Sequence, residues 1–112
     1  MEEKISGNTV NDHSDLIKAL GESDRVIALF YASWCPFCAR FLPGFQKQIA
    51  QTGRQVVLVQ DDQEAMAGAY SVTIYPTVLF FENGAVSKRL DGAPGIGLDE
   101  KQLTEFINRC PL

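Results

Sequence analysis

The stretch that decides the fold reads Val26-Ile27-Ala28-Leu29-Phe30-Tyr31-Ala32-Ser33-Trp34-Cys35-Pro36-Phe37-Cys38. Its first six residues form an apolar run, which is typical of a strand buried on both faces of a sheet. A helical pattern follows, with apolar side chains at Phe41, Phe45 and Ile49 and a terminating Gly53. The two cysteines are therefore expected where a buried strand passes into a helix.

The spacing of these cysteines fits a redox-active pair. Residues i and i+3 of a helix are neighbours, within the roughly 4.4–6.8 Å between Cα atoms that a disulfide needs. We expect Cys35 at the exposed start of the helix, Pro36 in its first position and Cys38 shielded one turn later. A helix N-terminus favours a negative charge by up to about 2 kcal/mol, so Cys35 is the expected nucleophile and Cys38 the resolving thiol.

Two other roles are open to a closely spaced cysteine pair. One is a structural disulfide and the other is half of a zinc site, but zinc needs two more ligands. Only Cys110 and His13 remain as ligands, and neither belongs to a second paired motif, so no metal is expected. Cys110 completes an apolar helical stripe and is expected to be packed, with a regulatory disulfide or a glutathione adduct left open.

The first half of the chain alternates between strand and helix patterns. A short opening segment covers residues 4–10, and a brief apolar stripe ending at Leu20 predicts a helix. Residues 56–59 read as a second buried strand. Asp61 with Glu64 predicts a capping box for a helix that reaches about Tyr70.

The second half predicts a hairpin and a last helix. Asn83-Gly84 between strand patterns at 77–81 and 86–90 is a strong hairpin signal, and Asp99 with Gln102 predicts the next helix cap. The order βαβαβαββα implies parallel strands joined through helices and a closing antiparallel pair. We expect one α/β domain over residues 1–112, with a central mixed sheet of four to five strands flanked by helices on both faces.

Composition excludes several classes of protein. The chain has 112 residues, of which 46% are hydrophobic and 21% charged, as expected of one globular domain. Its net charge of −4 is unlike that of a nucleic-acid binder. The longest strongly apolar run, residues 26–32, is far shorter than the roughly 20 residues of a membrane span. The acidic start Met1-Glu2-Glu3-Lys4 is unlike a secretory signal, so the cytoplasm is expected, although an exported mature domain would look the same.

The chain resembles the thioredoxin family over about residues 10 to 107. The residues that carry the resemblance are Phe30 to Cys35, Cys38, Pro43, Tyr75-Pro76-Thr77, Gly84 and Gly92. The resemblance implies the thioredoxin fold and a cis peptide bond before Pro76. It also implies a substrate-binding region made of Trp34, Pro36, Phe37, Tyr75, Pro76, Thr77 and Gly92.

The chain departs from the family pattern beneath the cysteines. The family usually has Gly-Pro between them, where this chain has Pro36-Phe37. A buried Asp six residues before the first cysteine corresponds to Leu29, and its usual lysine partner to Val57. Since both charges are absent, neither is left buried alone. We therefore expect Cys38 to lose its proton to water or to the departing partner thiolate.

The resemblance implies a thiol–disulfide oxidoreductase that reduces protein disulfides through Cys35 and Cys38. It needs no bound cofactor, because the Cys35–Cys38 disulfide is itself the redox group. The expected partners are disulfide-bearing proteins and an external reductase such as a thioredoxin reductase, and the protein is expected to be a monomer. Tyr75, where aliphatic residues are common, is expected to narrow partner choice. An exported disulfide oxidase or isomerase and a non-catalytic thioredoxin-fold binding module are the alternatives.

Overall fold

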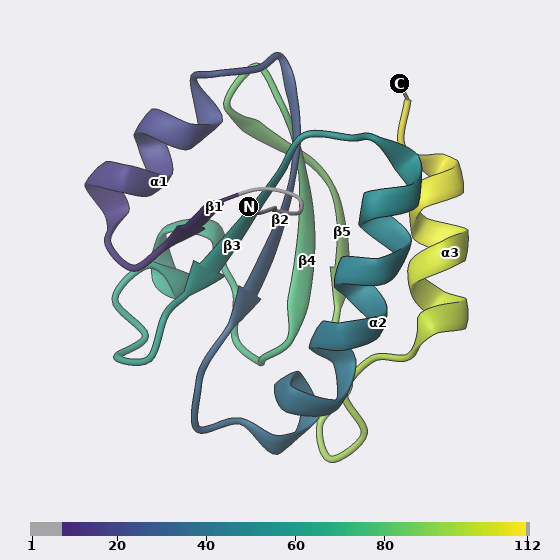
Figure 1. Ribbon diagram of the computed structural model, residues 1–112. Helices are drawn as coiled ribbons and strands as arrows, with labels where there is room; N and C mark the ends of the chain where they lie inside the picture. The colour runs from purple at the N-terminus through teal and green to yellow at the C-terminus, as the bar shows by residue number, and fades with distance from the viewer. Residues whose placement is uncertain (1–7, 112) are drawn as a thin grey trace, which may run out of the picture.

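The computed structural model describes residues 8–111 of the chain (Figure 1). Its elements are β1 (Asn8–Val10), α1 (His13–Leu20), β2 (Arg25–Tyr31), α2 (Pro36–Thr52), β3 (Val56–Gln60), η1 (Ala67–Tyr70), β4 (Thr77–Glu82), β5 (Ala85–Asp91) and α3 (Glu100–Arg109). Residues 4–7 of the expected opening segment, and the acidic residues 1–4 used to judge export, lie outside the described residues.

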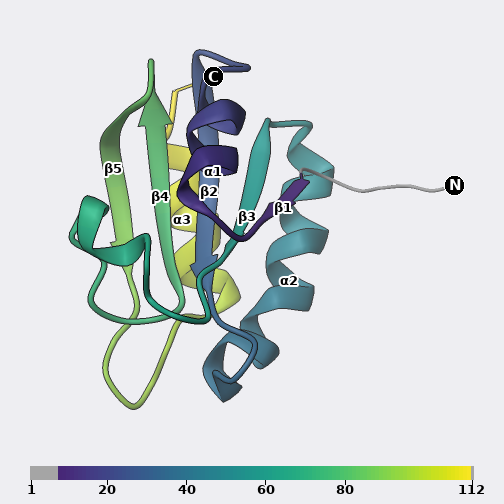
Figure 2. The same cartoon turned by 90° about the vertical axis from the view of Figure 1, so that its left-hand side faces the viewer.

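The strands described form a five-stranded sheet in the order β1-β3-β2-β4-β5, which Figure 2 shows side by side. β2 pairs with β3 in parallel and with β4 in antiparallel fashion, so the sheet is mixed. Helix α1 covers one face of the sheet, while α2 and α3 cover the other (Figure 1). The predicted fold class is confirmed.

The core lies on both faces of the sheet because β2 is buried on both sides, as its apolar run predicted. Ala28 and Phe30 point into the cluster beneath α1, whereas Ile27 and Leu29 point toward α2 and α3. Side chains therefore alternate between the two layers along the strand. The strand is fixed from both sides, and so is the start of the loop that carries the cysteines.

The helix predicted after β3 is wrong. Only a short 3-10 helix, η1, forms there, and Glu64 has a φ of 57°, a left-handed conformation that does not fit inside a right-handed helix. The Asp61 carboxylate accepts from the amides of Met66 and Ala67 instead of capping a helix at Glu64. The segment is therefore a turn folded around a buried side chain.

The later helix and hairpin signals are confirmed. Asn83 and Gly84 have φ values of 53° and 82°, the two positive values that a tight hairpin between β4 and β5 requires. Asp99 accepts from the amide of Gln102 at 2.8 Å, and the Gln102 side chain accepts from the Asp99 amide at 3.0 Å. This capping box starts α3 at the predicted place.

The two edges of the sheet are β1 and β5. Within the described residues β1 covers Asn8–Val10. β5 is exposed along most of its length, and its register with β4 shifts between Phe80 and Phe81. On β5, Arg89 pairs with Asp91 at 2.8 Å and donates to the carbonyls of Tyr70 and Ser71, which ties the strand to η1.

Candidate active site

Both cysteines lie at the N-terminal end of α2, at the bottom of the view in Figure 1. Cys35 is the N-cap residue and Pro36 takes the first helical position, as predicted. The Cys38 amide donates to the Cys35 sulfur at 3.3 Å. The sulfur thus occupies the place where a helix N-terminus offers its unpaired N–H groups to a negative charge.

The expectation of an exposed Cys35 is wrong, since Cys35 is 5% exposed and Cys38 is 2% exposed. The cover over Cys35 comes from a distant part of the chain. Its thiol donates to the Tyr75 carbonyl at 3.7 Å. Cys35 nevertheless lines an open groove of about 330 Å³.

Burial has a chemical consequence for Cys38. Desolvation, with the hydrogen bond to Cys35, raises the pKa of the Cys38 thiol well above its ordinary value. Cys38 therefore remains a protonated thiol at neutral pH in the reduced protein.

The groove contains five of the predicted site residues. Trp34, Cys35, Pro36, Phe37 and Tyr75 line it, together with Glu64, Ala67, Val72, Thr73 and Ile74. Trp34 is 57% exposed, and its ring centroid lies 6.0 Å from that of Tyr75. The groove walls are mostly apolar, which suits a protein surface better than a small charged ligand.

Of the other four predicted residues, Cys38 lies buried in the first turn of α2, and Pro76, Thr77 and Gly92 form a buried support beside Tyr75. The Tyr75–Pro76 peptide bond is cis. Thr77 donates to the Ile74 carbonyl at 2.8 Å and accepts from the Gly92 amide at 3.4 Å. A Cβ atom at Gly92 would collide with the Pro76 carbonyl oxygen, so only glycine fits there.

Phe37 is held from two sides at the rim of the groove. The Arg40 guanidinium lies 4.9 Å from the centroid of its ring. On the other side, a tight turn between β5 and α3 is closed by the bond from the Gly97 amide to the Ala93 carbonyl at 2.8 Å. A Cβ at Gly97 would lie 2.9 Å from the Phe37 Cβ, so this turn packs closely on Phe37 and carries Ile96, which is 74% exposed.

Two site residues that sequence reasoning assigned only to a helix cap are Asp61 and Asp62. Asp62 accepts from the Ser33 amide at 2.7 Å and from its hydroxyl at 2.8 Å, which lowers the pKa of that carboxyl. Its carbonyl accepts from the Trp34 indole N–H at 2.9 Å. Asp61 is 2% exposed and bonds to the Tyr75 hydroxyl at 2.7 Å. The only signal for them was a pair of acidic residues directly after a buried strand.

The assignment of the family's missing lysine to Val57 needs correction. In the sheet Leu29 lies directly opposite Leu58, and both belong to the cluster beneath α2 and α3. Val57 lies opposite Ala28 in the other cluster, because neighbouring strand residues face opposite ways. The neighbour of Leu29 is still apolar, so the absence of a buried charge pair there is unchanged.

Cys110 and His13 lie apart from the cysteine pair. Cys110 ends α3 and is buried, which raises the pKa of its thiol, and His13 on α1 bonds to the Tyr70 hydroxyl at 2.9 Å. Within residues 8–111 no group of three or more His, Cys, Asp or Glu side chains is placed to hold a metal ion. No helix in that range is both long and apolar enough to cross a membrane.

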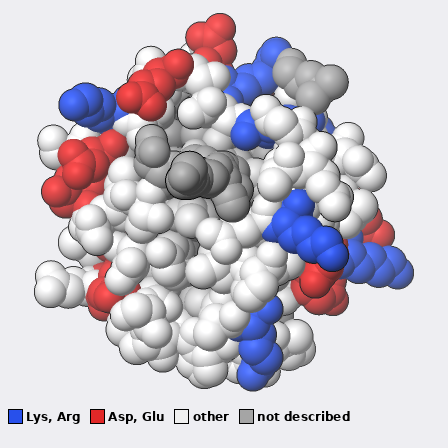
Figure 3. All heavy atoms as spheres, in the orientation of Figure 1, with Lys and Arg blue, Asp and Glu red and all other residues white. Residues whose placement is uncertain are grey.

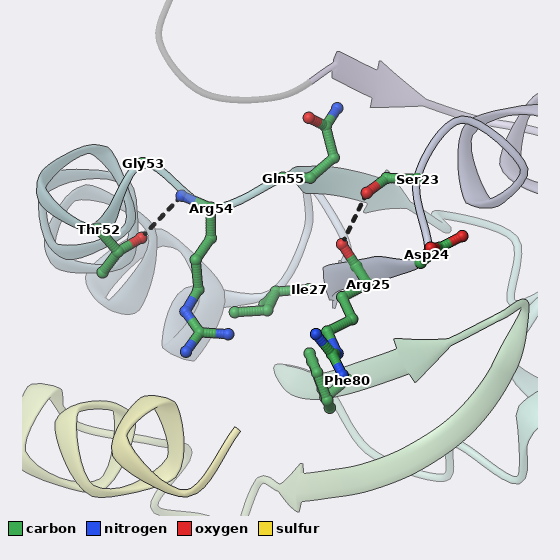
Figure 4. Close-up of a pocket in the computed structure, with 9 residues that line it drawn as sticks. All are labelled: Ser23, Asp24, Arg25, Ile27, Thr52, Gly53, Arg54, Gln55 and Phe80. Carbon is green, nitrogen blue, oxygen red and sulfur yellow. Dashed lines mark hydrogen bonds between the residues drawn. The ribbon is translucent and has the colours of Figure 1, made fainter. Parts of the chain in front are cut away.

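A second pocket, of about 450 Å³, lies at the opposite end of α2 and of β2 (Figure 4). Ile27 and Phe80 contribute apolar side chains to it, and Arg25 and Arg54 contribute guanidinium groups. Both guanidinium groups already have partners, since Arg25 pairs with Glu82 and Arg54 donates to the Cys110 and Pro111 carbonyls. This pocket does not contact the cysteine pair.

Comparisons with known proteins agree with this site. The family model described as Thioredoxin matches residues 5–109. The chain is 32% identical over 112 residues to a thioredoxin of Mycolicibacterium smegmatis, covering 96% of this chain and 100% of that protein. It is 33% identical over 81 residues to protein disulfide-isomerase A5 of Bos taurus, covering 67% of this chain but only 16% of that protein.

A solved structure extends the similarity to three dimensions. The Fasciola hepatica thioredoxin superposes with a TM-score of 0.75 and 27% identity, covering 92% of this chain and 97% of that one. The model match, the similarity over the full length of a bacterial thioredoxin and the shared fold agree with the paired cysteines at the head of α2. The chain therefore belongs to the thioredoxin family of thiol–disulfide oxidoreductases.

Proposed function

We propose that the protein reduces disulfides in partner proteins through a cycle carried by Cys35 and Cys38. The observation that carries the proposal is Cys35, whose sulfur accepts from the Cys38 amide at the start of α2 and which lines the groove. A thiolate formed there has a helix N-terminus beneath it and a route to an incoming disulfide in front of it.

The cycle has two exchanges. The Cys35 thiolate attacks one sulfur of the partner disulfide, forms a mixed disulfide and expels the other partner sulfur as a thiolate. Cys38 gives up its proton to that thiolate or to water and attacks the Cys35 sulfur. The second partner sulfur leaves, the partner has gained two electrons, and Cys35 and Cys38 are joined by a disulfide.

The groove residues supply the proposed partner contacts. Trp34, Phe37 and Tyr75 offer apolar surface around Cys35. The segment from Tyr75 to Thr77 is proposed to align an extended partner chain through backbone bonds, with Pro36 and Gly92 completing the contact region. Apart from Glu64, the residues that line the groove carry no charge, which favours a protein partner.

Reduction is the proposed direction. The similarity covers 100% of the M. smegmatis thioredoxin but 16% of the bovine disulfide-isomerase, which supports a thioredoxin-like role of residues 1–112 as one domain. An external reductase, of the thioredoxin reductase type, is proposed to return two electrons to the Cys35–Cys38 disulfide.

The cycle uses no bound organic cofactor, and its proposed setting is the cytoplasm, with the protein acting as a monomer. On the face drawn in Figure 3, Lys and Arg are interspersed with Asp and Glu around uncharged surface.

The test combines an equilibrium with a turnover measurement. The Cys35/Cys38 pair is titrated against reduced and oxidised glutathione, and turnover is followed with a disulfide-bonded protein. A potential below about −220 mV with turnover supports the proposal, whereas a potential near about −120 mV without turnover indicates an oxidase. A Cys35→Ser/Cys38→Ser variant that keeps partner binding and its cellular effect would contradict it in favour of a binding module.

A further inference from the structure

Asp61 is a buried carboxylate that the redox cycle does not use. It is 2% exposed, and its oxygens accept from the Met66 amide at 3.0 and 3.1 Å, from the Ala67 amide at 2.9 Å and from the Tyr75 hydroxyl at 2.7 Å. A buried carboxylate is costly unless such donors satisfy it. Two of the three donors belong to its own loop, and the third belongs to the wall of the groove.

We propose that Asp61 is a positioning residue for the disulfide exchange: by holding the Tyr75 hydroxyl, it fixes the groove wall against which a protein substrate aligns beside Cys35. This inference rests on the proposed function and deepens it. It assigns a specificity role to a residue that contacts neither the cysteines nor the substrate.

The geometry connects Asp61 to the reacting sulfur through one side chain. At one end of Tyr75 the hydroxyl is bound to Asp61, and at the other its carbonyl accepts from the Cys35 thiol at 3.7 Å. Tyr75 is 8% exposed, and its ring lies edge-on to the ring of Trp34. Because both ends are bound, Tyr75 has little freedom to move away from Cys35.

The neighbouring residue of the same turn holds Trp34. The Asp62 carboxylate accepts from Ser33, and the Asp62 carbonyl accepts from the Trp34 indole N–H. Two consecutive residues of one turn thus hold Tyr75 and Trp34, whose ring centroids lie 6.0 Å apart and which both line the groove with Cys35. The turn therefore supports this part of the groove through both aromatic side chains.

The protonation state of Tyr75 is consistent with a permanent bond. Burial and the hydrogen bond to Asp61 raise the pKa of the Tyr75 phenol well above its ordinary value. The phenol therefore remains a donor over the whole pH range in which thiol exchange is measured. The contact is a fixed support for the wall rather than a switch.

The test removes one oxygen atom. Tyr75→Phe keeps the ring and the backbone but loses the bond to Asp61, and Tyr70→Phe is the matched control because the Tyr70 hydroxyl bonds to His13 outside the groove. For Tyr75→Phe we expect KM for a disulfide-bonded protein to rise about tenfold, the effect of one lost bond to a charged group. The rate of Tyr75→Phe with a small disulfide, oxidised glutathione, should fall less than its rate with the protein, whereas both rates of Tyr70→Phe should stay within about twofold of wild type.

A second variant and a substrate-free readout keep the outcome decisive. Asp61→Ala, which removes the acceptor, should raise KM at least as much as Tyr75→Phe does, and adding Tyr75→Phe to Asp61→Ala should change KM little, because the bond is already absent. Without substrate, amide hydrogen exchange at Thr77 and Gly92 should become faster in Tyr75→Phe but not in Tyr70→Phe.

The failures are distinguishable. An equal loss of activity in Tyr75→Phe with the protein substrate and with oxidised glutathione would overturn the positioning role. A lower Tm without any kinetic change would also overturn it, because the bond would then serve stability alone. Wild-type protein that turns over neither substrate would defeat the proposed function, and unchanged amide exchange in Tyr75→Phe would separately defeat the fixed wall.

Discussion

The two ends of α2 solve the same structural problem with different chemistry. At its N-terminus the Cys38 amide is satisfied by the Cys35 sulfur. At its C-terminus the chain turns at Gly53, which has a φ of 68°, and the Thr52 hydroxyl donates to the Ile49 carbonyl of the last turn at 2.7 Å. One end has a polarisable, reactive acceptor, and the other is closed by bonds that do not react.

The surroundings of the two ends differ in the same way. The pocket beside Arg54 contains guanidinium groups that are already paired. The groove beside Cys35 is mostly apolar, and Asp61 and Asp62 bond to two of the residues that line it, Tyr75 and Trp34. The pocket at the unreactive end is the larger of the two, so pocket size does not decide which end reacts. What distinguishes the reactive end is a cysteine sulfur that accepts from the helix N-terminus beside a groove.

The largest expected effect comes from breaking the reactive end. Cys35→Ser should abolish measurable reduction of a disulfide-bonded protein, because a hydroxyl at this position does not form the nucleophile. Arg54→Ala, at the other end, should lower the free energy of unfolding by about 1 kcal/mol and leave turnover unchanged. Turnover assays and urea unfolding of both variants check this, and an active Cys35→Ser protein would contradict it.

The second prediction separates the two cysteines. Cys38→Ser should accumulate the mixed disulfide between Cys35 and its partner, because the resolving thiol is missing. Mass spectrometry under non-reducing conditions measures the trapped species. Cys110→Ser is the control at the far end and should trap none. Free release of partner from Cys38→Ser would show that another group resolves the intermediate.

The third prediction concerns the support behind Tyr75. Gly92→Ala should lower the free energy of unfolding by about 1–3 kcal/mol and slow protein reduction, because the new methyl group collides with the Pro76 carbonyl. Gly68→Ala is the matched control, since a Cβ there meets nothing within 4 Å. Thermal unfolding and turnover measure both effects. A fully stable, fully active Gly92→Ala protein is the contrary result.

The fourth prediction is a pH dependence. Folding raises the pKa of Cys38 by burial, so its contribution to stability is complete below the ordinary thiol pKa of about 8.5 and is lost as the pH rises toward the folded value. The reduced protein should lose up to about 1.4 kcal/mol per pH unit from this thiol in alkaline solution. Urea unfolding at pH 7–10 tests it: Cys38→Ser should reduce the slope, and Cys110→Ser, which removes another thiol whose pKa is raised by burial, should reduce it separately. A slope unchanged in Cys38→Ser would contradict the assignment.

The smallest expected effect is at the rim of the groove. Ile96→Ser should raise KM for a protein substrate about two- to fivefold by removing exposed apolar surface beside Phe37. Because Ile96 is 74% exposed, stability should change by less than about 0.5 kcal/mol. Ile17→Ser is the matched control, because Ile17 is 55% exposed on α1. Equal KM shifts in both variants would remove the rim from the substrate surface.

Local signals were enough to predict most of the fold and the reacting pair. The apolar run of β2, Pro36 at the start of α2, the turn at Asn83-Gly84 and the capping box of α3 each act within a few residues. Such features are visible in the sequence because the partners are neighbours in it.

The failures all concern contacts between distant segments. Asp61 reads as a helix cap, but its carboxylate binds Tyr75, 14 residues away. Cys35 reads as exposed, but the carbonyl beside its sulfur comes from 40 residues away. Val57 reads as the neighbour of Leu29, but the neighbour is Leu58, because the register of β3 is decided by its pairing with β2.

The edges of the sheet also bear on how the protein behaves beside other exposed strands. An open sheet edge presents unpaired backbone groups on which the strand of another chain can add. At the β5 edge the register with β4 shifts between Phe80 and Phe81, and the charged pair Arg89–Asp91 lies on the strand. Irregular pairing and charged side chains both make an edge a poor template for a further strand. The β5 edge is therefore protected against edge-to-edge aggregation by its own irregularity and charge.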